Sequence, residues 1–205
     1  PGSVRLQGNY YRQGDDVEIF GGVAAGRVGE RIELSGGVQR LSGAGVFDKT
    51  GIVIGGKYLF TRETDPVALR IAAGGGYSNA LLKNIHAYVV GTKSLSGVAG
   101  IQHNITLHGG VRWDRFEALG FDSDKASVFG GIEIPFTRTG ALTFVGELQS
   151  KNADGASTPY SAGVRYAIPR GWSGTLGVAR QGLNRTGIFL EIGKNFSSGF
   201  LGQGQ

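Results

Sequence analysis

The sequence predicts an all-β fold, an antiparallel up-and-down transmembrane β-barrel of about 12 strands. Three observations support this prediction. Runs of roughly 9–11 residues alternate apolar and polar side chains with a period of two, which is typical of strands and not of helices. Glycine, with 38 copies in 205 residues, interrupts the apolar face, and a densely packed soluble core would be left with voids there. Aromatic residues gather near the run ends, as an interfacial girdle requires.

The alternation is clearest at the end of the chain. Three runs follow one another there, Tyr160–Ile168, Trp172–Arg180 and Thr186–Phe196. In the last of them Ile188, Leu190, Ile192 and Phe196 share one face, and Gly187, Glu191, Gly193 and Asn195 share the other. Pro169–Gly171 and Leu183–Arg185 are predicted to be the turns between these runs.

The same pattern predicts nine earlier strands: Val4–Arg12, Val17–Ala25, Arg31–Leu41, Gly51–Phe60, Val67–Tyr77, Ile85–Leu95, Thr106–Phe116, Lys125–Phe136 and Ala141–Lys151. In the second of these we expect Val17, Ile19 and Val23 on the lipid side and Glu18 with Phe20 on the inner side. Ile85–Leu95 is the least clear run, since its two faces are almost equally apolar. Ser94–Ile105 is an irregular insertion that has the length for an extra strand.

The connections fall into two sets that alternate along the chain. One set is longer and acidic or amide-rich: Gly14–Asp16, Ser42–Lys49, Ser78–Asn84, Leu119–Asp124 and Asn152–Pro159. The other is mostly tighter and carries arginine: Arg27–Gly29, Thr61–Pro66, Thr137–Gly140 and Pro169–Gly171. Long loops at one end and short turns at the other are typical of membrane barrels. An even strand count predicts both termini on the periplasmic side, with one barrel domain over residues 1–196 and a tail over 197–205.

The closing run Gly187–Phe196 resembles the last strand of bacterial outer-membrane β-barrels, which typically ends in an aromatic residue that the barrel-assembly machinery recognises. Phe196 is that aromatic residue, whereas Lys194 stands where a second aromatic residue is common and nine residues follow the phenylalanine. The resemblance identifies a class and no particular family. It implies the outer membrane of a Gram-negative bacterium, with outer-membrane lipid and the assembly machinery as partners.

In such a barrel the polar face lines the interior. The candidate pore-lining residues are Arg5, Glu18, Glu33, Lys57, Arg70, His108, Arg112, Asp114, Glu133, Glu147, Arg165 and Glu191. Acids and bases are nearly balanced in this set, which predicts little ion preference. Inner-face glycines such as Gly74, Gly76 and Gly131 are expected to leave room for water. The favoured function is a narrow pore, or porin-like channel, that transports small hydrophilic solutes.

Several alternatives stay open. A non-conducting structural or adhesive barrel would bind a surface partner through its outer loops, and a soluble all-β binding domain is a third reading. No enzyme is expected, because only His108 lies clearly on the inner face and no nucleophile motif accompanies it. We expect no metal or other cofactor. The net charge of +5 is scattered without a basic cluster, so nucleic acid is not an expected partner. An oligomer or a periplasmic partner is left undecided.

Overall fold

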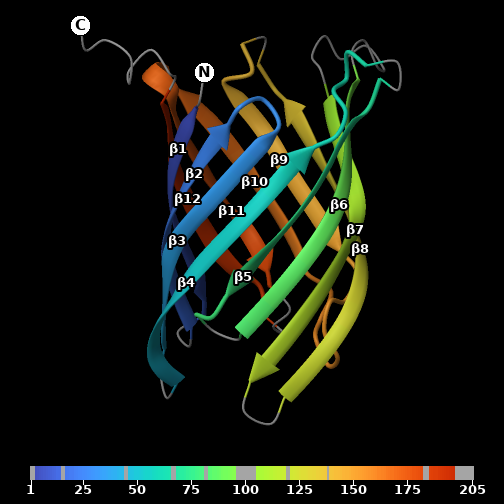
Figure 1. Cartoon of the computed structure of the whole chain (residues 1–205). Helices are drawn as coiled ribbons and strands as arrows, with labels where there is room; N and C mark the ends of the chain where they lie inside the picture. The colour runs from blue at the N-terminus through green and yellow to red at the C-terminus, as the bar shows by residue number, and fades with distance from the viewer. Residues whose placement is uncertain are drawn as a thin grey trace, which may run out of the picture.

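Twelve antiparallel strands close into a barrel in the computed structural model, which describes residues 3–14, 17–43, 46–65, 68–80, 83–95, 105–118, 121–137, 139–181 and 185–196 (Figure 1). The strands are β1 (Val4–Gln13), β2 (Val17–Val28), β3 (Ile32–Gly43), β4 (Val46–Leu59), β5 (Arg70–Ser78), β6 (Lys83–Leu95), β7 (Ile105–Ala118), β8 (Phe121–Pro135), β9 (Leu142–Gln149), β10 (Tyr160–Ile168), β11 (Trp172–Arg180) and β12 (Gly187–Phe196). Among the described residues, no helix is long and apolar enough to cross a membrane.

Each strand pairs with its neighbours in the sequence, and the first strand pairs with the last. Val4 stands opposite Phe196 and Arg12 opposite Ile188 along the β1–β12 seam. This seam leaves no free sheet edge, which is why a barrel can stand in a medium without water. The predicted fold class is therefore confirmed. The proposed extra strand within Ser94–Ile105 falls mainly on residues 96–104, and the tail on 197–205, both outside the described residues.

The start of β1 and the end of β12 lie at one end of the barrel, the terminal end, and the connection after each odd-numbered strand lies at the opposite end, the loop end (Figure 1). The predicted difference in loop length between the ends is wrong. At the loop end, connections 44–45 and 119–120 are as short as any, beside the long 150–159. At the terminal end, the tight turns 29–31 and 169–171 stand beside the long 60–69.

Large apolar side chains cover the outside of the wall. Leu176 is 63% exposed and Val128 60%, values far from those of a packed core. The same outer set includes Leu6, Phe20, Leu34, Val38, Ile54, Val89, Val111, Leu148, Ile188 and Ile192. Such a surface suits hydrocarbon, and it argues against the soluble alternative. Aromatic pairs mark both ends of it, with ring centroids 5.0 Å apart for Tyr58 and Phe60 at the terminal end and 4.7 Å for Tyr10 and Phe20 at the loop end.

Strand β2 presents its faces the opposite way from the prediction. Ile19 lies opposite Tyr11 and packs in a small inner cluster with Leu41 and Ala179. Phe20 is 47% exposed on the outside against Tyr10. Both faces of this run carry apolar residues, so the pattern within β2 does not show which face points into the lumen. The register with β1 determines it. A change of one position in register reverses every side chain of a strand.

Candidate functional site: the barrel lumen

Eleven of the 12 predicted pore-lining residues lie on the inner face. Residues that stand opposite each other share a face of the sheet, and the register pairs Glu33 with Lys57, His108 with Thr92 and Arg165 with Thr143. The inner set is Arg5, Glu33, Lys57, Arg70, His108, Arg112, Asp114, Glu133, Glu147, Arg165 and Glu191. That these residues line a conducting pore stays a prediction.

Glu18 is the exception, and its assignment to the pore wall is wrong. It stands opposite Arg12 on the outer face near the loop end. Tyr10 donates a hydrogen bond of 3.2 Å to its carboxylate, and Arg12 lies 3.7 Å from the same oxygen. Glu18 lies on the outer face because both faces of β2 are reversed relative to the prediction.

Several inner-face residues were missed. Arg27 stands opposite Glu33, and Lys125 opposite Asp114. His86 stands opposite Asp114, and Tyr88 opposite Arg112. Arg27 was missed because the faces of β2 were assigned in reverse. His86 and Tyr88 were missed because the two faces of β6 are almost equally apolar. Lys125 was detectable, since it is in phase with Ser127 and Glu133 in the same predicted run. Lys49 likewise shares the inner face, opposite Leu41.

Three ion pairs and one histidine–carboxylate contact stabilise the inner wall of the barrel. The Arg112 guanidinium donates to both oxygens of Asp114 over 2.8–3.0 Å, and Asp114 has no exposed surface at all. A buried carboxylate needs such a partner, because an unpaired one would pay a heavy desolvation cost. Arg165 lies 3.1 Å from Glu133, and Lys57 lies 3.0 Å from Glu33. His108 is 3.9 Å from Glu147.

The pairing leaves an excess of positive charge on the inner face. The inner positions of the described strands carry eight Arg or Lys residues and five Asp or Glu residues, a difference of three. On the inner face of the described strands, the side chains of Arg5, Arg27, Lys49 and Arg70 form no hydrogen bond or ion pair, and among the inner acids only Glu191 lacks one. The removal of Glu18 and the addition of Arg27, Lys49 and Lys125 therefore overturn the predicted balance.

The unpaired arginines gather at the terminal end. A hollow of about 860 Å³ is lined by Arg27, Lys57 and Arg70 together with loop residues of 60–69. A smaller hollow of about 210 Å³ is lined by Arg5, Arg27 and Gln7. Arg27 and Glu33 border both hollows. In the larger hollow five Arg or Lys residues stand against the three glutamates Glu30, Glu33 and Glu63, so the lining is net positive and we call this mouth the cationic region.

Loop 60–69 is tied to the wall at this mouth. The Arg62 guanidinium donates to Glu30 in the turn between β2 and β3. The backbone amide and the hydroxyl of Ser94 donate to Glu63, and these hydrogen bonds hold the pKa of Glu63 below its ordinary value. The Arg62–Glu30 pair is exposed and contributes little to stability by itself, whereas the Ser94–Glu63 hydrogen bonds are half-buried.

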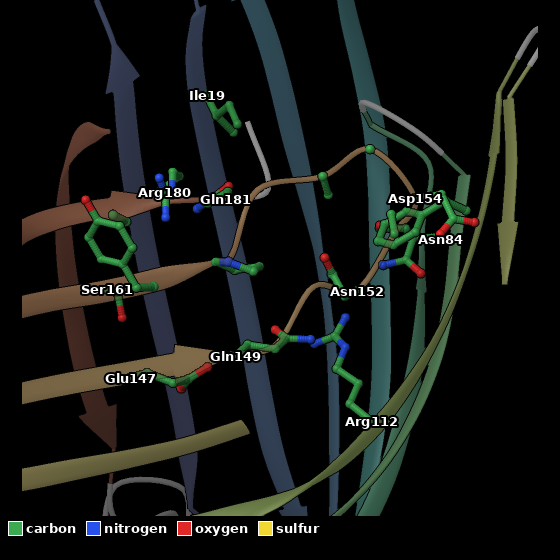
Figure 2. A pocket seen from close by; sticks show the side chains of 18 of the residues that line it. Ile19, Asn84, Arg112, Glu147, Gln149, Asn152, Asp154, Ser161, Arg180 and Gln181 are labelled. Carbon is green, nitrogen blue, oxygen red and sulfur yellow. The ribbon is translucent and has the colours of Figure 1, made fainter. Parts of the chain in front are cut away.

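A different hollow, of about 670 Å³, lies at the loop end (Figure 2). We call it the loop-end hollow. Its lining includes Arg112, Glu147 and Gln149 from the wall and residues 152–156 from the connection between β9 and β10. The view in Figure 2 shows Arg112 and Asn152 directed into the same space from the wall and from this connection.

The connection 150–159, which we call the strap, folds inward along β8. The β8 strand continues past its last pairing with β9, at Phe129 and Gln149, and the strap follows that extension. Ser150 exchanges two hydrogen bonds with Val128, of 2.8 and 3.0 Å. The Asp154 amide donates to Ser123 at 3.1 Å, and its carboxylate lies 3.0 Å from Lys125. The strap thereby narrows the loop end of the lumen.

Glycine has another use on the inner face than the one predicted. Aromatic and histidine rings stand against glycines of nearby strands, so these glycines make room for side chains. A Cβ atom at Gly76 would stand 2.9 Å from the His86 ring, and one at Gly74 would stand 2.6 Å from the Tyr88 hydroxyl. The same arrangement places His108 on Gly131, Phe129 on Gly110, Phe189 on Gly163 and Gly177, and Tyr11 on Gly187.

No group of three or more His, Asp or Glu side chains in the described part of the chain could hold a metal ion. Within the same residues, His86 and His108 are the histidines on the wall; His108 faces Glu147, and His86 lies beside Asp114 with its Nδ1 atom unpaired. Neither histidine is hydrogen-bonded to a serine or threonine hydroxyl, as an activated nucleophile would need.

Solved structures with a similar architecture include bacterial porins. A KdgM porin matches with a TM-score of 0.68 at 15% identity, over 94% of this chain and 99% of that chain, and its complex with disordered oligogalacturonate matches with 0.71 at 14% over the same shares. A NanC porin matches with 0.67 at 12%, over 95% and 99%. Omp33 of Acinetobacter baumannii matches with 0.51 at 10%, over 95% and 97%.

These identities are low, and the likenesses establish the fold alone, a closed β-barrel. No protein-family model matches the sequence, and no curated protein matches it either.

Proposed function

We propose that this protein is a passive channel of the bacterial outer membrane that conducts small hydrophilic solutes and favours anions. The observation that carries the proposal is the set of unpaired cations on the inner wall, Arg5, Arg27 and Arg70, which border the hollows of the terminal end. Fixed positive charge in a narrow lumen raises the local concentration of anions and lowers that of cations.

The apolar outer face and the porin-like fold support the outer membrane as the location, with its lipid as the surrounding partner. Transport is favoured over catalysis because the inner face offers ion pairs and arginines, and its described residues include no activated nucleophile. One similar porin was solved with oligogalacturonate, an acidic oligosaccharide. Small acidic sugars are therefore suitable first solutes to test.

Planar-bilayer recording tests this proposal. The purified barrel is expected to give discrete current steps, and a salt gradient is expected to give a reversal potential of the sign for anions. The inner-face variants Arg27→Gln and Arg70→Gln should move that potential toward the cation side. Arg40→Gln is the matched control, since Arg40 pairs with Asp48 on the outer face. Barrels that are folded but electrically silent would contradict the proposal.

A further inference from the structure

The two ends of the lumen differ in chemistry. The terminal end carries unpaired guanidinium groups, whereas the loop-end hollow is bordered by neutral amides: Gln39, Asn84, Gln149, Asn152 and Gln181. An amide side chain offers both donors and an acceptor, so it can bond to a hydroxyl in either role. An uncharged, hydroxyl-bearing ligand matches such a lining better than an ion does.

Most of these amides have hydrogen-bonding capacity to spare. Within the described residues, the side chains of Gln39, Asn152 and Gln181 form no hydrogen bond. Gln149 and Asn84 are committed elsewhere, since Gln149 donates to Ser127 at 2.8 Å and the Asn84 Nδ2 donates to Asp114 at 3.2 Å. The three unpaired amides come from β3, the strap and the end of β11, so they approach the hollow from different sides.

The charges beside the hollow nearly balance, because Arg112 and Asp154 are paired and the two that remain, Arg180 and Glu147, bear opposite signs. Arg112 is bound to both oxygens of Asp114. Asp154 is paired with Lys125 at 3.0 Å. Arg180 donates to the Thr158 carbonyl and lies 5.0 Å from the centroid of the Tyr160 ring. Hydrogen bonding therefore outweighs net charge as the source of recognition here.

We propose that the loop-end hollow binds the uncharged, hydroxyl-rich part of a passing solute, such as a short oligosaccharide chain. Its volume of about 670 Å³ falls within the roughly 300–1,000 Å³ of small-molecule sites. The proposal rests on the proposed channel function and adds a solute class and a location to it. A solute that enters from the loop end meets hydroxyl-binding amides first and the cationic region afterwards.

The test uses a neutral probe. Maltotriose is added on the loop-end side of single channels in a planar bilayer, and the interruptions of the ion current give its binding constant. The double variant Gln39→Ala/Asn152→Ala is expected to weaken binding about tenfold, as the loss of two ordinary hydrogen bonds would. Gln7→Ala is the matched control, because Gln7 is an inner amide of the terminal-end hollow. Heat-modifiable gel mobility checks that each variant is folded.

The outcomes separate the two proposals. Binding that is weakened in the double variant and unchanged in Gln7→Ala supports the site. Anion-selective channels that maltotriose does not interrupt, or interrupts equally in all variants, overturn the site and leave the channel function standing. Folded barrels without any current overturn both.

Discussion

Gly109 and Gly110 are neighbours on β7, and the structure predicts opposite results when each is changed to alanine. Gly110 faces inward: a Cβ atom there would stand 2.1 Å from the Val89 carbonyl oxygen and 2.9 Å from the Phe129 ring. Gly109 faces outward, and the nearest atom to its added Cβ would be the Phe129 carbonyl oxygen at 3.6 Å, an ordinary contact.

The expected magnitudes follow from these contacts. At position 110 a backbone atom must shift as well as a ring, which is overpacking and costs about 1–3 kcal/mol of folding free energy. At position 109 alanine has room, and it gains about 0.5–1 kcal/mol by restricting the unfolded chain. The two variants should therefore differ by about 1.5–4 kcal/mol in folding free energy.

Urea titration of the barrel in phospholipid vesicles measures this difference, with the folded fraction read from heat-modifiable gel mobility. Gly110→Ala should unfold at lower urea than the unmodified protein, and Gly109→Ala at equal or higher urea. If the two variants agree within about 0.5 kcal/mol, the rings on the inner wall do not depend on glycine and the packing described above is wrong.

Three further predictions concern the strap, the terminal-end loop and the closing strand. Cysteines in place of Ser123 and Asp154, in a chain that has none, should cross-link on oxidation, because the Asp154 amide donates to the Ser123 hydroxyl at 3.1 Å; a folded barrel that forms no cross-link on non-reducing gels would contradict the course of the strap. The pKa of Glu63 is lowered by its hydrogen bonds from Ser94, so the stabilisation they give is full above the ordinary glutamate pKa of about 4.3 and is lost as pH falls through the lower folded value. The Ser94 amide resonance should follow that titration, and a shift that persists in Glu63→Gln would contradict it. Phe196→Ala should reduce the yield of heat-modifiable barrel in cells while refolding in vitro changes little; unchanged yield would remove its role as an assembly signal.

Strand number and the outward position of most apolar residues were predictable from period-two alternation. Successive side chains of a barrel strand face lipid and the lumen in turn, so the alternation of apolar and polar residues is strong wherever one face is clearly apolar. In the closing strand, the outer face is clear from the sequence, because Ile188 and Ile192 share one face and Glu191 lies on the other. The ion pairs Lys57–Glu33 and Arg165–Glu133 then follow from register, which a sequence alone does not contain.

The misassigned elements are those with apolar residues on both faces. Ile19 and Phe20 are adjacent, and only the neighbouring Tyr11 decides that Ile19 turns inward. His86 and Tyr88 alternate with Ile85 and Ala87, so the polar and apolar sets of β6 are hard to separate. The strap was predicted as an acidic outer connection. Its inward course depends on the extension of β8 beyond β9, which no local signal reports.

The rings that lie on glycines tie pairs of positions together across the strands. Tyr88 fills the place that any side chain at residue 74 would need, and His108 does the same for residue 131. Neither member of such a pair can change alone without either a collision or a bare stretch of peptide facing the water. Sequence drift in this wall should therefore proceed by paired exchange, with a large residue on one strand replaced only as its glycine partner gains a side chain.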